Sequence, residues 1–148
     1  KAFNTRYGFA RGDLVLRHLS ELIVESLRFV GCEDHFVGHM GADDFVVICG
    51  QDDAERVARE TAAAFDTSIL DYYGDEDRDR GYFTLTDRNG EEVRHGPLTL
   101  SAAVIQLTDH FPTSAITLND VGQELLTYAR TQPGSSVAVE RRSEPGAR

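Results

Sequence analysis

One change of hydrophobic period constrains the fold of this chain more than any other feature of its sequence. Apolar residues between positions 13 and 30 recur three or four positions apart, which predicts an amphipathic helix that ends near Gly31. They are Leu16, Leu19, Ile23, Leu27 and Val30. Two short extended runs follow, at residues 35–40 and 45–49, and the second is rich enough in β-branched residues to predict a buried strand. A helix followed directly by a hairpin predicts a fold that mixes α and β structure.

The middle of the chain repeats this alternation. Asp52 and Asp53 are candidate N-caps of a second helix. The apolar line of that helix is Val57, Thr61, Ala64, Phe65 and Ile69. Residues 71–96 predict an acidic loop followed by a small hairpin, because Asn89-Gly90 separates two extended runs.

The last third of the sequence predicts a strand at residues 98–107, a third helix at 119–130 and a final strand at 136–141. The predicted inward residues of that helix are Leu125, Leu126 and Ala129. Neither an internal repeat nor a long linker is visible. We therefore expect a single domain over residues 1–142, which includes the loop and hairpin insertion at 71–96, and a polar tail at 143–148.

Composition excludes several classes of function. The formal net charge is −10, which argues against nucleic acid as a partner because phosphate binding needs a basic face. No apolar run approaches the roughly 20 residues that span a bilayer, and the sequence opens without a signal peptide. Cys32 and Cys49 are the two cysteines, which fits a reducing compartment better than a disulfide framework. We expect a cytoplasmic protein without membrane contact.

Asp43 and Asp44 stand side by side at the predicted tip of the first hairpin. Adjacent carboxylates repel one another, so the chain must leave them in water or supply a cation. The first alternative is a solvated turn, and the second is a metal or nucleotide site. His35 and His39 alternate on the preceding run, but no third ligand at suitable spacing supports a zinc site.

Four stretches in order resemble the GGDEF family, the diguanylate cyclases that condense two GTP molecules into cyclic di-GMP. Gly41-Ala42-Asp43-Asp44-Phe45 stands at the family's signature. Lys1, Asn4, Gly8 and Gly12-Asp13 stand at its FKxxND-x-x-GH-x-x-GD stretch. LTLSAAV, residues 98–104, stands at its TxSiGv strand, and LLTYARTQPG, residues 125–134, stands at its ALYxAKxxG stretch.

The resemblance implies an α+β palm of the nucleotidyl-cyclase or ferredoxin-like type. Its central sheet is antiparallel with helices packed on it, and a small hairpin is inserted. The first strand of that sheet is expected upstream of Lys1, where the family carries an aspartate that binds metal.

The same resemblance implies roles for individual residues. Asp43 is expected to bind Mg²⁺ or Mn²⁺ together with the upstream aspartate, and Asp44 to act with it near the reacting hydroxyl group. Gly41 and Ala42 are expected to pass close to the phosphates.

The remaining expected nucleotide-binding residues are Lys1, Asn4, Asp13 and Arg130, of which Arg130 replaces a phosphate-binding lysine. Asn4 and Asp13 stand at the positions that read guanine. An amide and a carboxylate suit that base, because they complement its ring oxygen and its N–H groups.

The sequence departs from the family at the positions closest to the chemistry. Ala42 replaces the second glycine of the signature, and Asp44 is one methylene shorter than the usual glutamate. The family's inhibitory product site, RxxD, is absent, since the equivalent stretch is Cys32-Glu-Asp-His35. These departures favour a domain that keeps guanine recognition and has impaired or lost catalysis.

Each candidate residue also has a structural interpretation. Asp13 suits an N-cap of the first helix, and Asn4 suits a loop residue that hydrogen-bonds its own backbone. Arg130 suits a surface cation near a helix C-terminus. The run at residues 75–80, DEDRDR, suits a solvated loop or a surface on which a partner docks.

Three hypotheses for function follow. The first is a regulatory domain of bacterial cyclic di-GMP signalling that binds GTP without efficient catalysis. The second is an active diguanylate cyclase, and the third is a structural or dimerisation domain without a ligand. Expected partners are GTP, a second copy in a homodimer, and covalently linked sensor or output domains.

Overall fold

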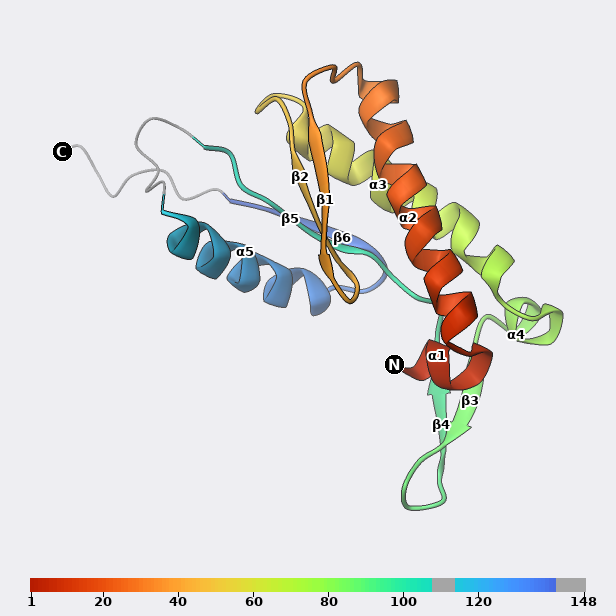
Figure 1. Ribbon diagram of the computed structural model, residues 1–148. Helices are drawn as coiled ribbons and strands as arrows, with labels where there is room; N and C mark the ends of the chain where they lie inside the picture. Colours follow the sequence, from red (N-terminus) through yellow and green to blue (C-terminus); the bar gives the residue numbers. More distant parts are fainter. Residues whose placement is uncertain (108–113, 141–148) are drawn as a thin grey trace.

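The structure, a computed structural model, describes residues 1–107 and 114–140 (Figure 1). Its helices are α1 (Ala2–Tyr7), α2 (Phe9–Val30), α3 (Ala54–Ser68), the 3₁₀ helix η1 (Ile69–Tyr72), α4 (Asp75–Arg80) and α5 (Ala115–Arg130). Its strands are β1 (Phe36–Gly41), β2 (Asp44–Ile48), β3 (Phe83–Thr86), β4 (Glu92–His95), β5 (Ser101–Val104) and β6 (Ser136–Val139). The predicted mixed α/β class is confirmed. None of these helices combines the length and the apolar character needed to cross a membrane.

The strands described here pair as three separate two-stranded sheets rather than as one central sheet. β1 pairs with β2, and β3 with β4, both antiparallel as the two predicted hairpins require. β5 and β6 are parallel, which differs from the antiparallel sheet that was expected. The physical reason is their connection, because a helical crossover such as α5 returns the chain to pair in the same direction.

The N-terminal segment is more helical than expected. α2 begins at Phe9 rather than at position 13, and α1 precedes it. Gly8, with φ of 85°, separates the two helices and is the N-cap of α2. The predicted N-cap role of Asp13 is therefore wrong, since Asp13 lies inside α2. The predicted end at Gly31 is confirmed, with φ of 85° and a hydrogen bond from Cys32 N to Leu27 O of 3.0 Å that closes the last turn.

The core forms where α2 and α3 pack together. Leu27 of α2 has no exposed surface. The predicted apolar line of α3 is confirmed, since Val57, Thr61, Phe65 and Ile69 are buried and Ala64 is partly buried. Asp53 takes the predicted N-cap position, but its side chain makes no capping hydrogen bond. Burial of this two-helix seam supplies the main hydrophobic stabilisation of the molecule.

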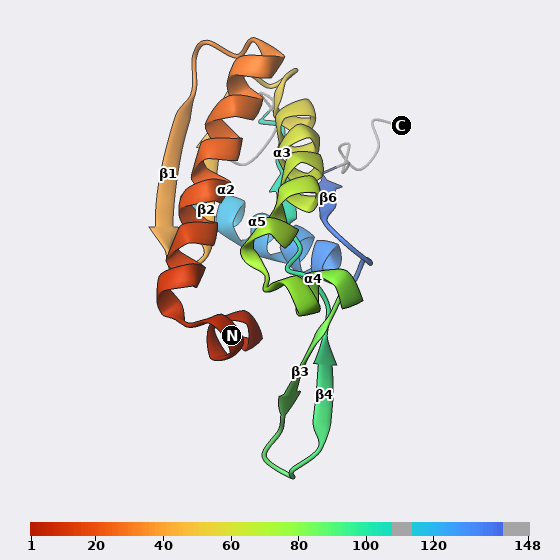
Figure 2. The ribbon, with the colours of Figure 1, turned by 90° about the vertical axis from the view of Figure 1, so that its right-hand side faces the viewer.

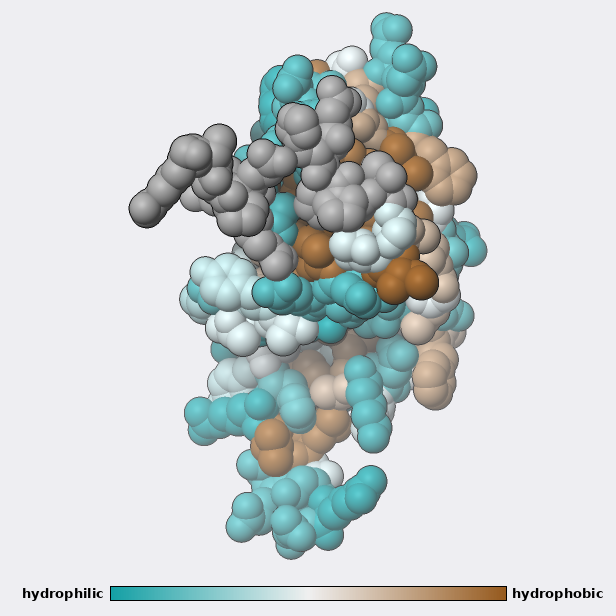
Figure 3. All heavy atoms as spheres, turned by 90° about the vertical axis from the view of Figure 1, so that its left-hand side faces the viewer, coloured by the Kyte–Doolittle hydropathy of each residue, from teal (hydrophilic) through white to brown (hydrophobic). Residues whose placement is uncertain are grey.

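The first hairpin covers the core with one face only. Val37, Phe45, Val47 and Cys49 pack against the buried cluster. The predicted burial of the second strand is wrong, because the other face of the hairpin carries the exposed side chains of Phe36, Met40 and Ile48, the last of them 64% exposed. Figure 3 shows hydrophobic residues among the exposed atoms of one face of the molecule. A strand with one uncovered face buries only every second side chain.

The segment 71–96 contains a short helix where an acidic loop was expected. DEDRDR forms α4, and Asp77 within it is buried. The predicted hairpin at Asn89-Gly90 is confirmed as β3 and β4, which project from the rest of the molecule (Figure 2). Its turn is closed by Asp87, whose Oδ1 accepts hydrogen bonds from the backbone N–H groups of Asn89 and Glu91 at 2.8 and 2.9 Å.

The C-terminal elements differ from the prediction at their ends. β5 is shorter than residues 98–107, because the N–H groups of Leu98 and Leu100 donate to the side chains of Tyr73 and Ser135 rather than to a strand. α5 begins earlier than position 119, at a cap in which Ser114 Oγ accepts from Thr117 N at 3.1 Å.

The inward residues predicted for α5 are partly confirmed. Ala129 is buried, whereas Leu125 and Leu126 are half-buried. The predicted tail at 143–148 lies outside the described residues, and so does residue 141 at the end of the predicted last strand.

Candidate functional site

The signature stretch forms the turn between β1 and β2. Gly41 has φ of 112° and Ala42 has φ of 49°, so both take the left-handed backbone that favours glycine. His39 stacks on Phe45 with ring centroids 4.6 Å apart, and His39 Nε2 donates a hydrogen bond of 3.0 Å to the carbonyl oxygen of Ala42. These contacts support the turn from within the hairpin.

Asp43 and Asp44 are both exposed at this turn. Their carboxylates supply the oxygen ligands that Mg²⁺ takes, and Mg²⁺ usually keeps several waters and needs only one or two protein carboxylates. Among residues 1–107 and 114–140, no three His, Cys, Asp or Glu side chains gather around one point. The pair therefore fits one side of a hydrated magnesium site and equally fits a solvated turn.

The corner between α1 and α2 places the Asn4 side chain against Gly12, the residue before Asp13. The side chain of Asn4 lies directly on Gly12, so that a Cβ added at Gly12 would be 2.2 Å from Asn4 Oδ1. Asp13, the next residue, is exposed. Asn4 lies in α1 rather than in a loop, and its carbonyl oxygen accepts from Gly8 N at 2.9 Å. The corner therefore holds the Asn4 amide against the residue that precedes the exposed Asp13.

The acidic turn lies toward the N-terminal end of α2. In both Figure 1 and Figure 2 the closed end of the β1–β2 hairpin lies at the height of the first turns of α2, above α1. Lys1 is exposed at the N-cap of α1. Arg130 is exposed at the last residue of α5, which packs on β5 and β6, a position that also suits a surface cation at a helix C-terminus.

Asp77 of α4 is a buried acid that the sequence did not single out. Arg6 Nε donates to Asp77 Oδ2 at 2.9 Å, and Tyr7 Oη donates to the same oxygen at 2.6 Å. Arg80 donates to Oδ1. These donors, led by the Tyr7 hydroxyl, lower the pKa of Asp77 to about 2. No local pattern distinguishes Asp77 from its acidic neighbours, because Arg6 and Tyr7 lie far away in the sequence.

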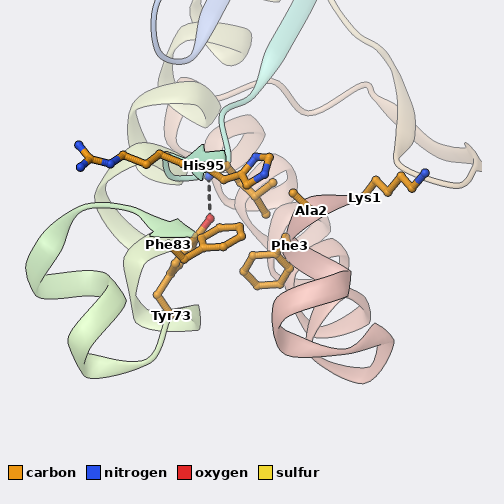
Figure 4. A pocket seen from close by; sticks show the side chains of 9 residues that line it. Lys1, Ala2, Phe3, Tyr73, Phe83 and His95 are labelled. Atoms are coloured by element: carbon orange, nitrogen blue, oxygen red, sulfur yellow. Dashed lines mark hydrogen bonds between the residues drawn. The ribbon is translucent and has the colours of Figure 1, made fainter. Parts of the chain in front are cut away.

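A cavity of about 320 Å³ opens beside α1, with an aromatic floor formed by Phe3, Tyr73 and Phe83 (Figure 4). His95 lies over Phe83 at a centroid distance of 5.4 Å. Tyr73 Oη accepts a hydrogen bond of 2.8 Å from Leu98 N, and burial raises the pKa of Tyr73 to about 12. Lys1 lies at the edge of the cavity, but its side chain points away from the aromatic floor (Figure 4).

No family model matches this chain, and no curated protein matches its sequence. Any assignment of function therefore depends on the residues of the chain and on their geometry.

Proposed function

We propose that this chain is a GGDEF-type domain of bacterial cyclic di-GMP signalling that binds GTP and has impaired or lost cyclase activity. Its role would then be regulatory. The observation that carries the proposal is the corner at which the Asn4 amide lies on Gly12 beside Asp13. The Gly41–Asp44 turn lies at the height of the first turns of α2 (Figure 1).

Guanine is the base that suits such a corner. Its ring oxygen accepts a hydrogen bond from an amide, while its ring N–H and amino group donate to a carboxylate. Adenine carries an amino group in place of that oxygen, and it lacks both the ring N–H and the 2-amino group of guanine. The same pair of side chains therefore discriminates against adenine. Buried or partly buried hydrogen-bonding sites reject the wrong analogue because its groups are left unpaired.

Two residues of the Gly41–Asp44 turn, Ala42 and Asp44, support the proposed loss of efficient catalysis. Ala42 carries a methyl group on a backbone with φ of 49°, which costs about 1–2 kcal/mol relative to a relaxed residue. In the proposed role, that methyl group would also crowd the phosphates. Asp44 is one methylene shorter than the glutamate of the family, and a displacement of about 1 Å at a reacting centre can cost about 100-fold in rate.

The proposal includes a palm in which a further strand lies between β2 and β5. In the described residues β2 pairs only with β1, and β5 pairs only with β6. Both strands run from the lower to the upper part of Figure 1, and Gln106 Nε2 donates to Gln51 O at 3.3 Å beyond their ends. A strand antiparallel to both would run down toward α1 and join the two sheets into one.

Calorimetric titration with GTP and with ATP, each with Mg²⁺, tests the proposal. We expect GTP to bind more tightly than ATP, and Asn4→Ala or Asp13→Ala to abolish the difference. Asp52→Ala, an exposed aspartate at the start of the α3 region, is the matched control and should leave binding unchanged. The same samples are then assayed for cyclic di-GMP.

The outcomes separate the three hypotheses. Binding of GTP with little or no product supports a regulatory nucleotide-binding domain. Efficient formation of cyclic di-GMP would make the chain an active diguanylate cyclase despite Ala42. Absence of GTP binding would contradict both and favour a structural or dimerisation domain.

A further inference from the structure

α4 holds a carboxylate that is both buried and surrounded by donors. The Asp77 side chain is only 2% exposed, yet it accepts from Arg6, Tyr7 and Arg80. Two of these donors belong to α1 and one to α4 itself, so the contact ties the start of the chain to the segment near residue 77. We call Asp77, Arg6, Tyr7 and Arg80 the α1 clasp.

The neighbouring acids of α4 behave differently. Asp75 and Asp79 have side chains that are 87% and 78% exposed, and each forms an ion pair with Arg78. Exposed ion pairs of this kind contribute little to stability or to geometry. Asp77 therefore differs from its acidic neighbours in α4, because it is buried and makes a specific tertiary contact.

α1 depends on such contacts for its orientation. The helix has 6 residues, which is far below the length at which a helix is stable alone in water. Gly8 separates it from α2, so its axis is not determined by the longer helix. Phe3 anchors α1 in the aromatic cluster, with its ring centroid 5.2 Å from that of Tyr73. The clasp anchors the same face of the helix through Tyr7, whose ring lies 4.9 Å from that of Phe3, and adds the ion pair of Arg6 with Asp77.

We propose that Asp77 is a positioning residue that fixes α1 against α4 and thereby holds the Asn4 amide on Gly12, the residue before Asp13. Asn4 lies two and three residues before the clasped side chains of Arg6 and Tyr7, on a helix of less than two turns. A rotation of α1 that releases the clasp must therefore also move Asn4. The consequence for base recognition rests on the proposed guanine-nucleotide function, whereas the placement of α1 does not.

Hydrogen exchange measures the placement without any nucleotide. Asp77→Asn removes the charge, and Tyr7→Phe removes one donor and leaves the carboxylate paired with both arginines, which guards against a variant that fails to fold. Asp79→Asn makes the same chemical change on an exposed face of α4 and is the matched control. We expect the amide protons of Thr5 and Gly8, both hydrogen-bonded within the α1 region, to exchange about tenfold faster in the first two variants only. The NMR signal of the Asn4 side-chain amide should shift in the same two variants.

A nucleotide titration then distinguishes positioning from simple loss of stability. Partial unfolding lowers the fraction of protein that binds and leaves the GTP-to-ATP affinity ratio unchanged. Displacement of Asn4 lowers that ratio, by about tenfold or more. Faster amide exchange in α1 together with a lower GTP-to-ATP affinity ratio supports the proposal. Unchanged exchange and an unchanged Asn4 signal in Asp77→Asn would overturn it. Wild-type protein that binds no GTP, with α1 exchange still responding to Asp77→Asn, would contradict the nucleotide function and leave the positioning of α1 supported.

Discussion

Ala42 is the residue at which backbone conformation and side chain disagree most clearly. Its φ of 49° is the only positive value at a non-glycine position within residues 1–107 and 114–140. The neighbouring Gly41 has φ of 112°, where a side chain is also strained. The left-handed region brings Cβ close to the following carbonyl oxygen, and glycine avoids this contact.

Ala42→Gly should raise the free energy of unfolding by about 1 kcal/mol. Urea denaturation followed by circular dichroism measures the change. Gly41→Ala is the reciprocal control, in which the same substitution is reversed one residue earlier, and it should destabilise the protein. If Ala42→Gly is neutral or destabilising, the strain inferred at the turn is not present in solution.

Gly12→Ala should weaken GTP binding while leaving the fold intact. A methyl group at Gly12 would meet Asn4 Oδ1, the end of a flexible side chain, so that the amide must move. We expect affinity for GTP to fall by about tenfold, since one misplaced charge-assisted or specific hydrogen bond is worth about 1.5 kcal/mol. Alanine also favours the helix, so stability should not fall. Titration calorimetry and thermal unfolding measure the two effects.

Gly122→Ala in α5 is the matched control for Gly12→Ala. Both glycines lie inside helices, but the nearest atom to a Cβ at Gly122 is Ile105 Cδ1 at 3.8 Å, which is an ordinary contact. This control should stabilise α5 slightly and leave GTP binding unchanged. Equal loss of affinity in both variants would show that the effect does not come from Asn4.

At the scale of elements, the α1 clasp predicts a pH dependence of stability. The pKa of Asp77 is about 2 in the folded protein, against an ordinary value of 3.8, chiefly because the Tyr7 hydroxyl donates to the ionised carboxylate. A lowered pKa means that the stabilisation is fully present above pH 3.8 and is lost as the pH falls toward 2. The unfolded chain takes up the proton first in this window.

The free energy of unfolding of Asp77→Asn should therefore be lower than that of wild type at neutral pH. Between pH 3.8 and 2 it should fall less than the free energy of unfolding of wild type. Removal of one member of a buried, charged network costs about 2–4 kcal/mol. Denaturation at a series of pH values measures both quantities. Asp79→Asn controls for the other carboxylates, and a pH slope in Asp77→Asn equal to that of this control and of wild type would contradict the role of the clasp.

At the scale of the whole molecule, Phe83 connects the segment 71–96 to the core. Phe83 of β3 is 1% exposed and packs with Tyr7 and Tyr73 at centroid distances of 5.8 and 6.2 Å. Through these rings the projecting hairpin contacts α1 and the residue that follows η1. Unfolding of the hairpin and of the helices should accordingly be a single cooperative transition.

Phe83→Ala should destabilise the entire domain by about 3–5 kcal/mol, because a buried aromatic ring is replaced by a cavity. Val93→Ala on the partner strand β4 is the control, since Val93 is 39% exposed and should cost less than about 1 kcal/mol. Hydrogen exchange in α2 and α3 reports whether the helices respond. If Phe83→Ala loosens only β3 and β4, the segment is an independent appendage.

Elements with a local pattern were predicted correctly from the sequence. The apolar spacing of α2 and α3, the glycine that ends α2 and the Asn89-Gly90 turn each depend on residues within a few positions of one another. The positive φ of Ala42 likewise belongs to a local feature, the tight turn between β1 and β2. The contact of the Asn4 side chain with Gly12 depends on the α1–α2 corner, which was not predicted.

Contacts between distant residues were decided only by the tertiary structure. The burial of Asp77 depends on Arg6 and Tyr7, the parallel pairing of β5 with β6 depends on the crossover through α5, and the position of α1 depends on an aromatic cluster from three parts of the chain. Sequence periodicity reports which side of an element is apolar, because that depends on neighbours along the chain. It does not report which other element covers that side, because burial and ionisation are determined by the groups that folding brings together.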